Sequence, residues 1–362
     1  MEIHPALSIQ GIKYDGDAED FCRRLEMLFA MSDEKETQYV AQVCSFIRQW
    51  ASDDDTVICR TSGSTGTPKE IPIDKTRMKA SALMTCRYFG LWEGTRALLC
   101  LPVTFIAGKM MLVRAFTAGW KLTLKVPCSN PLDNTGDKIF DFAAFVPMQL
   151  YASAEQLQRV KKILAGGGEI SRKFICDIGN KTASGCEIYQ SYAMTETITH
   201  VALRMLYPQT EEEYTATEGV SFSLSKRGTL VITAPALLSF PLETNDMATL
   251  IDSTHFKWIG RTDTVINSGG VKIIPEQTEQ KLADILPGRY FAAGLPDDVL
   301  GEKQVLFVEG HSGDFQHLKS FLKSNFDGIH RPKDIIFMEK FPLTHTGKTD
   351  RKKILEDFRK HM

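Results

Sequence analysis

A short loop of hydroxyl and glycine residues, set between an apolar strand and a helix, most constrains how this chain can fold. The loop consists of Thr61, Ser62, Gly63, Ser64, Thr65, Gly66, Thr67, Pro68 and Lys69. Glycines let successive backbone N–H groups converge on an anion, and the hydroxyls and the lysine add donors and positive charge. An apolar strand, Thr56 to Cys59, precedes the loop, and we expect a helix from about Asp74. The loop therefore predicts a phosphate site on an α/β scaffold.

The loop does not match the Walker A motif G-x-x-x-x-G-K-[ST]. Its two glycines are three positions apart, and Pro68 separates Lys69 from the second glycine. A solvated loop rich in glycine and serine is the alternative to a phosphate site, and the loop alone leaves it open.

Short apolar runs alternate with helical or loop segments through the first part of the chain. Apolar residues recur at helical spacing near the start, around Phe21 and Val40. The apolar runs that follow are Ala97 to Leu101, Leu122 to Val126, Phe142 to Val146, Ile163 to Ala165 and Glu187 to Tyr189. This alternation indicates α/β layering around a substantially parallel sheet.

The pattern changes after about residue 217, where residues 228–233 and 248–259 are typical of antiparallel strands. Beyond Asp263 a compact unit of about 100 residues mixes strands and helices. We therefore expect a large domain of layered sheets and helices, residues 1–262, and a small α+β domain, residues 263–362.

Composition limits the classes of partner and compartment. The formal net charge of -2 gives no general case for binding nucleic acid or an anionic membrane. The eight cysteines contain no C-x-x-C pair, which favours reduced thiols. The N-terminus lacks the pattern of a signal peptide, and the longest apolar run is too short for a membrane span. We expect a cytoplasmic protein; whether it is a homo-oligomer stays open.

The 61–69 loop resembles the phosphate-binding signature of the adenylate-forming superfamily, which contains acyl-CoA synthetases, luciferases and peptide-synthetase adenylation domains. Further segments that resemble stations of this family follow in order as far as Arg351. The chain is shorter at its N-terminus than most members, so its first subdomain should be trimmed. The resemblance implies a large nucleotide- and acyl-binding domain and a small mobile C-terminal domain. It also implies ATP, Mg²⁺ and coenzyme A as the reactants besides a small carboxylic acid.

Residues 189–197 resemble the Y-G-x-T-E station of the family, with Ala193 in place of glycine. By this resemblance Tyr192 stacks on adenine, Thr195 contacts a phosphate, and Glu196 is both catalytic and a ligand of Mg²⁺. The alternative is a helix start with a capping threonine.

Two further segments resemble motifs of the family that bind the nucleotide. Gly167 and Gly168 follow an apolar run and resemble the glycine-rich turn over adenine and the acyl pocket. Asp246 closes a Thr-Asn-Asp segment that resembles the family's T-G-D, which implies that its carboxylate accepts both ribose hydroxyls.

The segment 260–276 resembles the hinge of the family and the loop that follows it. The resemblance implies that Arg261 contacts ribose or phosphate and that Asp263 is the hinge. Ser268, Gly269 and Gly270 would line the channel for coenzyme A, where glycines allow a narrow thiol arm to approach. An exposed hairpin turn is the alternative.

Residues 341–351 resemble the C-terminal station P-x-T-x-x-G-K-x-x-R, which makes Lys348 the catalytic lysine of adenylation. The alternative for a lone C-terminal lysine is a solvated charge.

The local sequence of residues 189–204 is most similar to that of the o-succinylbenzoate:CoA ligases of menaquinone biosynthesis. The resemblance implies acyl-pocket roles for Ser191, Thr197, Thr199 and His200, although His200 could also be a packed or surface residue. Phe105 stands where L-P-x-x-H-x-x-G has histidine, and Lys109 could bring a cation to the pocket or be solvated. Another aromatic or small-acid CoA ligase, or a catalytically silent nucleotide-binding homologue, remains as an alternative.

Overall fold

The protein divides into two compact units in a computed structural model. The structure describes residues 1–60, 70–181, 185–283, 285–286, 288–315, 317–344 and 349–359. The first unit contains Met1–Ile170, Phe174–Ser221 and Thr233–Pro241, and the second contains Ser171–Lys173, Phe222–Ile232 and Leu242–Met362. The expected domain boundary at residue 263 falls inside the second unit, and that domain division stays a prediction.

The first unit is built on a mixed sheet with a parallel centre. Its strands lie in the order β11-β10-β9-β8-β7-β5-β6-β1-β2, and the pairs from β9 to β1 are parallel. The strands are β1 (Ser8–Ile9), β2 (Ile12–Lys13), β5 (Arg96–Leu99), β6 (Lys121–Leu124), β7 (Phe140–Phe145), β8 (Val160–Ala165), β9 (Glu187–Ala193), β10 (His200–Tyr207) and β11 (Tyr214–Ala216). The predicted α/β layering around a largely parallel sheet is confirmed.

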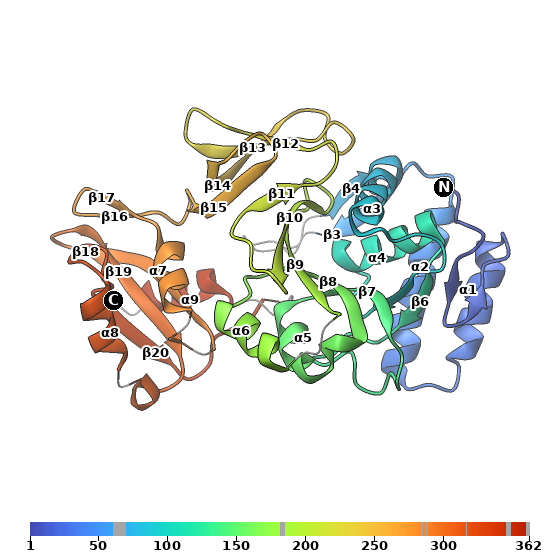
Figure 1. Ribbon diagram of the computed structural model, residues 1–362, viewed down its shortest axis with the longest axis horizontal. Helices are drawn as coiled ribbons and strands as arrows, with labels where there is room; N and C mark the ends of the chain where they lie inside the picture. Colours follow the sequence, from blue (N-terminus) through green and yellow to red (C-terminus); the bar gives the residue numbers. More distant parts are fainter. Residues whose placement is uncertain are drawn as a thin grey trace. The chain divides into compact units, whose positions relative to one another are not determined.

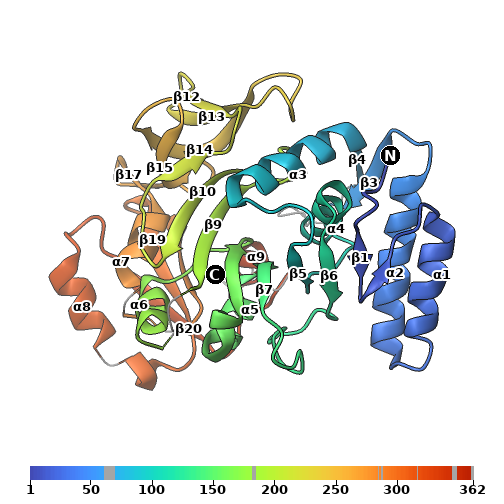
Figure 2. The ribbon, with the colours of Figure 1, turned by 45° about the vertical axis from the view of Figure 1, so that its right-hand side comes forward.

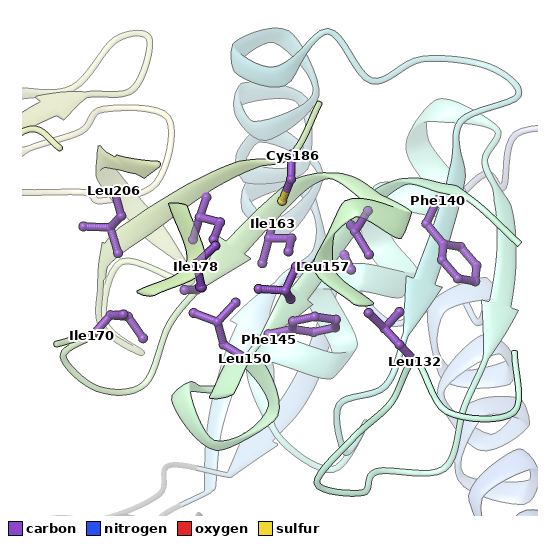
Figure 3. Packing of buried hydrophobic residues seen from close by; sticks show 14 of the residues in the cluster. Leu132, Phe140, Phe145, Leu150, Leu157, Ile163, Ile170, Ile178, Cys186 and Leu206 are labelled. Atoms are coloured by element: carbon purple, nitrogen blue, oxygen red, sulfur yellow. The ribbon is translucent and has the colours of Figure 1, made fainter. Parts of the chain in front are cut away.

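Helices cover both faces of this sheet. They are α1 (Ala18–Leu28), α2 (Glu34–Ala51), α3 (Lys75–Phe89), α4 (Ile106–Ala118), α5 (Pro147–Ala152) and α6 (Arg172–Lys181), with a 3₁₀ turn at Ala154–Arg159. Figure 3 shows the core on one face, where Phe145 of β7, Leu150 of α5 and Ile178 of α6 belong to one buried cluster. Phe142 points to the opposite face because strand side chains alternate, and there Phe89 of α3 packs on it with ring centroids 5.4 Å apart.

The helices α1 and α2 lie side by side at the start of the chain (Figure 2). Each begins at an aspartate whose carboxylate accepts backbone N–H groups of the first turn: Asp17 for α1 and Asp33 for α2. Phe21, Leu25 and Val40 are buried, as the helical spacing of apolar residues predicts.

A two-stranded antiparallel pair, β3 (Thr56–Arg60) and β4 (Glu70–Asp74), flanks the segment 61–69. Asp74 then caps α3 by accepting the N–H groups of Thr76 and Arg77. The sequence places the helix correctly but misses β4, because a five-residue strand that contains a proline depends on its partner rather than on its own pattern.

The second unit contains two groups of strands, of which the second is a sheet of its own. The strands β12 (Ser221–Leu224), β13 (Thr229–Thr233), β14 (Leu242–Leu250) and β15 (His255–Arg261) are neighbours in that order, and β13, β14 and β15 pair antiparallel as expected. The second group contains β16 (Ile266–Ser268), β17 (Val271–Ile273), β18 (Tyr290–Asp297), β19 (Gly301–Glu309) and β20 (Asp334–Met338).

This C-terminal sheet is covered on both faces, with α7 (Pro275–Leu282), α8 (Leu318–Asn325) and α9 (Arg351–Arg359) around it (Figure 1). Leu306 of β19 packs in one buried cluster with residues of α7 and α8. Val305 and Phe307 belong to another cluster, which contains Ile354 of α9. Alternate residues of one strand thus anchor helices on opposite sides.

All eight cysteines are free thiols, as their spacing predicts. Within the described part of the chain, no helix combines the length and apolarity that crossing a membrane requires.

Candidate active site

The turn after β8 requires glycine, both for its backbone conformation and for the close packing around it. Gly167 has a φ of 84°, in the left-handed region that side chains disfavour. A Cβ at Gly166 would lie 2.9 Å from the hydroxyl oxygen of Ser191, so only glycine fits there without displacing that side chain. The turn that sequence reasoning assigns to nucleotide and acyl binding thus lies directly against the segment 189–197.

Hydrogen bonds between side chain and backbone hold this turn to β9. The amide of Gln190 donates to the carbonyl oxygen of Gly168 at 3.2 Å, and the hydroxyl of Ser191 donates to that of Ala165 at 3.1 Å. Arg204 on β10 in turn donates to the side-chain oxygen of Gln190 at 2.7 Å. Hydrogen bonds therefore hold the glycine turn and the segment 189–197 together, and the Ser191 hydroxyl makes one of them.

Tyr192 lies near the end of β9 and is only 9% exposed. Its ring packs against Tyr214 of β11, with centroids 5.8 Å apart and planes tilted by 59°. The guanidinium of Arg204 lies over the Tyr214 ring at 4.9 Å. Neighbouring groups therefore fix the ring plane of Tyr192, which is the property that an adenine-stacking role requires.

The turn between β9 and β10 holds Thr195 and Glu196. The hydroxyl of Thr197 lies 2.7 Å from the carbonyl oxygen of Thr199, and Thr197 is fully buried. Glu196 is exposed and Thr195 is partly buried. The alternative of a capped helix start is wrong, because the turn leads into β10.

A buried polar cluster joins α3 to the start of β10. The hydroxyl oxygens of Ser81 and Thr199 are 3.0 Å apart, and the hydroxyl of Thr85 lies 3.3 Å from Nε2 of His200. Burial, with a smaller contribution from the charge of Arg114, holds the pKa of His200 well below its ordinary value of 6.5. His200 is 4% exposed and is a neutral imidazole at neutral pH, so the alternative of a surface histidine is wrong.

Arg114 of α4 brings a positive charge into the interior. It is 2% exposed, and burial lowers the pKa of its guanidinium to about 10. Its Nη1 lies 3.7 Å from the sulfur of Met111, and its Nε has no hydrogen-bond partner within the described ranges. Among the described residues no carboxylate forms an ion pair with Arg114, although a buried charge ordinarily needs one.

Phe105 and Lys109 stand at the start of α4. Phe105 precedes the first residue of the helix and gives no side-chain cap. Lys109 is 8% exposed, and its ammonium lies over the ring of Phe46 at 4.7 Å. The alternative of a solvated lysine is therefore wrong, and α4 carries two buried basic residues.

In the second unit, three sequence-predicted residues form one network. Arg261 donates from Nε and Nη2 to the carboxylate of Asp263 at 2.8 and 2.7 Å, which lowers the pKa of Asp263. Nη1 of Arg261 lies 3.6 Å from Oδ1 of Asp246. The same Oδ1 accepts the indole N–H of Trp258 at 3.1 Å. The residues expected at the ribose and the hinge are thus adjacent.

The loop after β16 takes the backbone form that its glycines suggest. Gly269 and Gly270 have φ values of 56° and 84°. The N–H of Gly269 donates to the carbonyl oxygen of Leu300 at 2.8 Å. Ser268 is fully buried, and its hydroxyl oxygen has no hydrogen-bond partner in the described part of the chain. The alternative of an exposed hairpin turn is confirmed at Gly269 and Gly270, which join the antiparallel strands β16 and β17, whereas Ser268 is buried. The role of this segment in a channel stays a prediction.

Two predicted stations lie outside the described residues: the phosphate loop 61–69 and Lys348. The structure therefore leaves their assignments as predictions. In the part of the chain that it does describe, no three histidine, cysteine, aspartate or glutamate side chains come together to hold a metal ion.

Sequence reasoning missed two residues that the structure brings to these sites, Arg114 and Trp258. Arg114 carries a signal that could have been found, since it is a lone cation among the apolar residues of Met110–Ala118. Trp258 carries none, because its contact with Asp246 depends on how β14 and β15 are paired.

A family model described as AMP-binding enzyme matches residues 17–226. The 2-succinylbenzoate–CoA ligase, chloroplastic/peroxisomal, of Arabidopsis thaliana is 25% identical over 418 residues, covering 94% of this chain and 74% of the relative.

Solved structures are also similar. An acyl-CoA synthetase (AMP-forming)/AMP-acid ligase II-like protein from Dyadobacter fermentans is 36% identical, with a TM-score of 0.60, covering 92% of this chain and 98% of that one. The o-succinylbenzoate coenzyme A synthetase of Bacillus subtilis, solved with ATP and a magnesium ion, is 18% identical with a TM-score of 0.70, covering 94% of this chain and 82% of that one. The last likeness concerns the fold alone.

Proposed function

The chain belongs to the AMP-binding enzyme family, and on that premise we propose that it is an ATP-dependent acid:CoA ligase whose acid is o-succinylbenzoate. In the first step a carboxylate oxygen of the acid attacks the α-phosphorus of ATP, giving an acyl-adenylate and pyrophosphate. In the second step the thiol of coenzyme A attacks the acyl carbon, giving the thioester and AMP.

The first step builds negative charge on the phosphates, so donors and cations must surround them. In this proposal the loop 61–69 and Lys348 supply them, and Glu196 contributes an oxygen ligand to Mg²⁺. Tyr192 and the glycine turn hold adenine, and Asp246 with Arg261 holds the ribose. The ordered ring of Tyr192 and the network around Asp246 support these roles.

The observation that carries the choice of acid is the buried Arg114. o-Succinylbenzoate has two carboxylates, of which only one is activated. The other must leave water, which is unfavourable unless a cation meets it. Among the described residues no carboxylate pairs with the Arg114 guanidinium, and His200, whose pKa its charge helps to lower, is neutral. We assign the second carboxylate to Arg114.

The test compares acids with one and two carboxylates. Arg114→Met should raise KM for o-succinylbenzoate about 10- to 100-fold in acid-dependent pyrophosphate exchange, because a charge-assisted hydrogen bond is lost. KM for a monocarboxylic aromatic acid should change little. Arg87→Met is the matched control, since Arg87 is exposed and pairs with Glu218. Equal changes for both kinds of acid would contradict the assignment.

A panel of carboxylic acids, assayed for AMP release with and without coenzyme A, tests the wider proposal. Release that depends on another aromatic or small acid would identify that acid as the substrate. No release with any acid would favour a catalytically silent nucleotide-binding homologue. Release without thioester formation would favour an adenylase with another acceptor.

The remaining assignments belong to the same proposal. Residues 263–362 form a small domain that turns about Asp263 between the two steps, and Ser268 to Gly270 line the coenzyme A channel in the second. The free thiols of all eight cysteines support a reducing compartment, the cytoplasm.

A further inference from the structure

We propose that Trp258 is a positioning residue for nucleotide recognition, because its indole N–H fixes the carboxylate that receives the ribose hydroxyls. This inference rests on the proposed role of Asp246. The indole nitrogen of Trp258 lies 3.1 Å from Oδ1 of Asp246, and Asp246 is 6% exposed. A hydrogen bond from a neutral donor holds the rotation of the carboxylate without cancelling its charge.

An irregularity in strand pairing creates this contact. Asp246 pairs with Arg261 and Met247 with Gly260, but Ala248 then pairs with Trp258, which leaves Ile259 as an extra residue. In regular pairing Trp258 would stand opposite Thr249 and point to the other face of the sheet from Asp246. The extra residue moves the indole onto the face of Asp246, diagonal to it and within reach.

The backbone at Asp246 is held as firmly as its side chain. The N–H of Asp246 donates to the hydroxyl oxygen of Thr244 at 3.0 Å, and that hydroxyl donates to the carbonyl oxygen of Leu230 at 2.9 Å. With main chain and Oδ1 both fixed, the carboxylate presents a defined direction to a ligand. An ionised carboxylate has about four acceptor positions, and the indole N–H occupies one of them, which orients the group.

Arg261 contacts the same oxygen at a longer distance. Its Nε and Nη2 donate to Asp263, and its Nη1 is 3.6 Å from Oδ1 of Asp246, compared with 3.1 Å for the indole nitrogen of Trp258. Such a contact is not general for tryptophan in this chain. The indole nitrogens of Trp50 and Trp120 are buried and have no hydrogen-bond partner among the residues that the structure describes. The contact of Trp258 with a carboxylate is therefore specific to the site.

The test measures discrimination between a diol and a single hydroxyl. The dissociation constants of ATP, 2′-deoxy-ATP and 3′-deoxy-ATP are determined by titration calorimetry, which needs no acid and no turnover. Trp258→Phe keeps the ring and removes only the N–H. We expect it to weaken ATP binding about three- to tenfold, to leave the deoxy analogues closer to their wild-type values, and thus to reduce the discrimination ratio.

A second variant separates positioning from packing. Asp246→Asn should abolish most of the discrimination, and Trp258→Phe should then add nothing in the Asp246→Asn background. Trp92→Phe is the control, because Trp92 is 48% exposed and lies in the first unit. Equal weakening of ATP and both deoxy analogues by Trp258→Phe, or no change with any of them, would overturn the proposal.

Failure of this inference and failure of the ligase proposal are distinguishable. If the protein discriminates ATP from its deoxy analogues through Trp258 but activates no acid, the role of Trp258 is supported and the ligase function is contradicted. If the protein is an active ligase but its discrimination between ATP and the deoxy analogues does not change in Trp258→Phe, the ligase function is supported and the role of Trp258 is contradicted. A wild-type protein that does not distinguish ATP from its deoxy analogues contradicts the role of Asp246, and the inference with it.

Discussion

His200 is a buried neutral imidazole whose surroundings are hydroxyls and the charge of Arg114. In the unfolded chain its pKa returns to about 6.5. The unfolded state therefore binds a proton below that pH while the folded state does not. The contribution of His200 to the free energy of unfolding therefore falls as the pH falls below about 6.5.

Replacing His200 by asparagine should remove this part of the pH dependence. Between pH 6 and pH 5 the free energy of unfolding of the wild type should fall more steeply than that of the variant, by up to about 1.4 kcal/mol per pH unit. Urea denaturation at several pH values measures both slopes. The exposed His317, changed in the same way, controls for composition. Parallel slopes in His200→Asn and the wild type would show that His200 is protonated in the folded state.

At the scale of elements, β15 and α7 approach each other closely at Gly260. A Cβ there would lie 2.5 Å from Cγ2 of Ile274 and 2.8 Å from Oε2 of Glu276. Neither neighbour can yield freely. Ile274 is β-branched and stiff, and Glu276 is 6% exposed with its other oxygen bonded to the Thr264 hydroxyl at 2.7 Å. A side chain at position 260 must therefore push β15 and α7 apart.

Gly260→Ala should lower the free energy of unfolding by about 1–3 kcal/mol, the usual effect of overpacking. Chemical denaturation followed by circular dichroism measures it. Gly328→Ala is a suitable control, because a Cβ at the exposed Gly328 would meet no atom within 4 Å. An unchanged denaturation midpoint in Gly260→Ala would show that β15 and α7 can separate at no cost.

Elements were predictable where a local pattern specifies them. The strand from Thr56, the helix that Asp74 caps and the helix from Pro275 all carry such signals. The strand β4 carries none, because its existence depends on pairing with β3. The same limit applies at the site: Asp246 lies in a recognisable segment, whereas Trp258 reaches it only through the extra residue between β14 and β15. Non-local register is not visible in a single sequence.

At the scale of the whole molecule, the proposed reaction requires one site to serve two chemistries. Adenylation needs cations at the phosphates, and thioester formation needs access for a thiol to the same carbonyl. In the proposed mechanism a domain turns about Asp263 and exchanges Lys348 for the segment Ser268 to Gly270, a hinge-type conformational step. The two half-reactions should therefore depend on different residues of the C-terminal domain.

Lys348→Ala should lower the rate of adenylation by about 100-fold or more, because one donor to the developing charge is removed. Thioester formation from preformed acyl-adenylate should be largely retained. Both are measured in single-turnover experiments, with Lys340→Ala as a control for an exposed lysine of the same domain. An equal loss in both half-reactions would count against exchange of the two segments.

The unmatched charge of Arg114 has a consequence for the abundance of the protein in the cell. A buried guanidinium that no described carboxylate pairs with destabilises the empty fold, and a bound anion that meets it stabilises the folded form alone. Cellular proteases degrade the unfolded fraction, which grows as stability declines. Molecules that lack their acid should thus have shorter lifetimes, so that supply of the substrate regulates the amount of its enzyme.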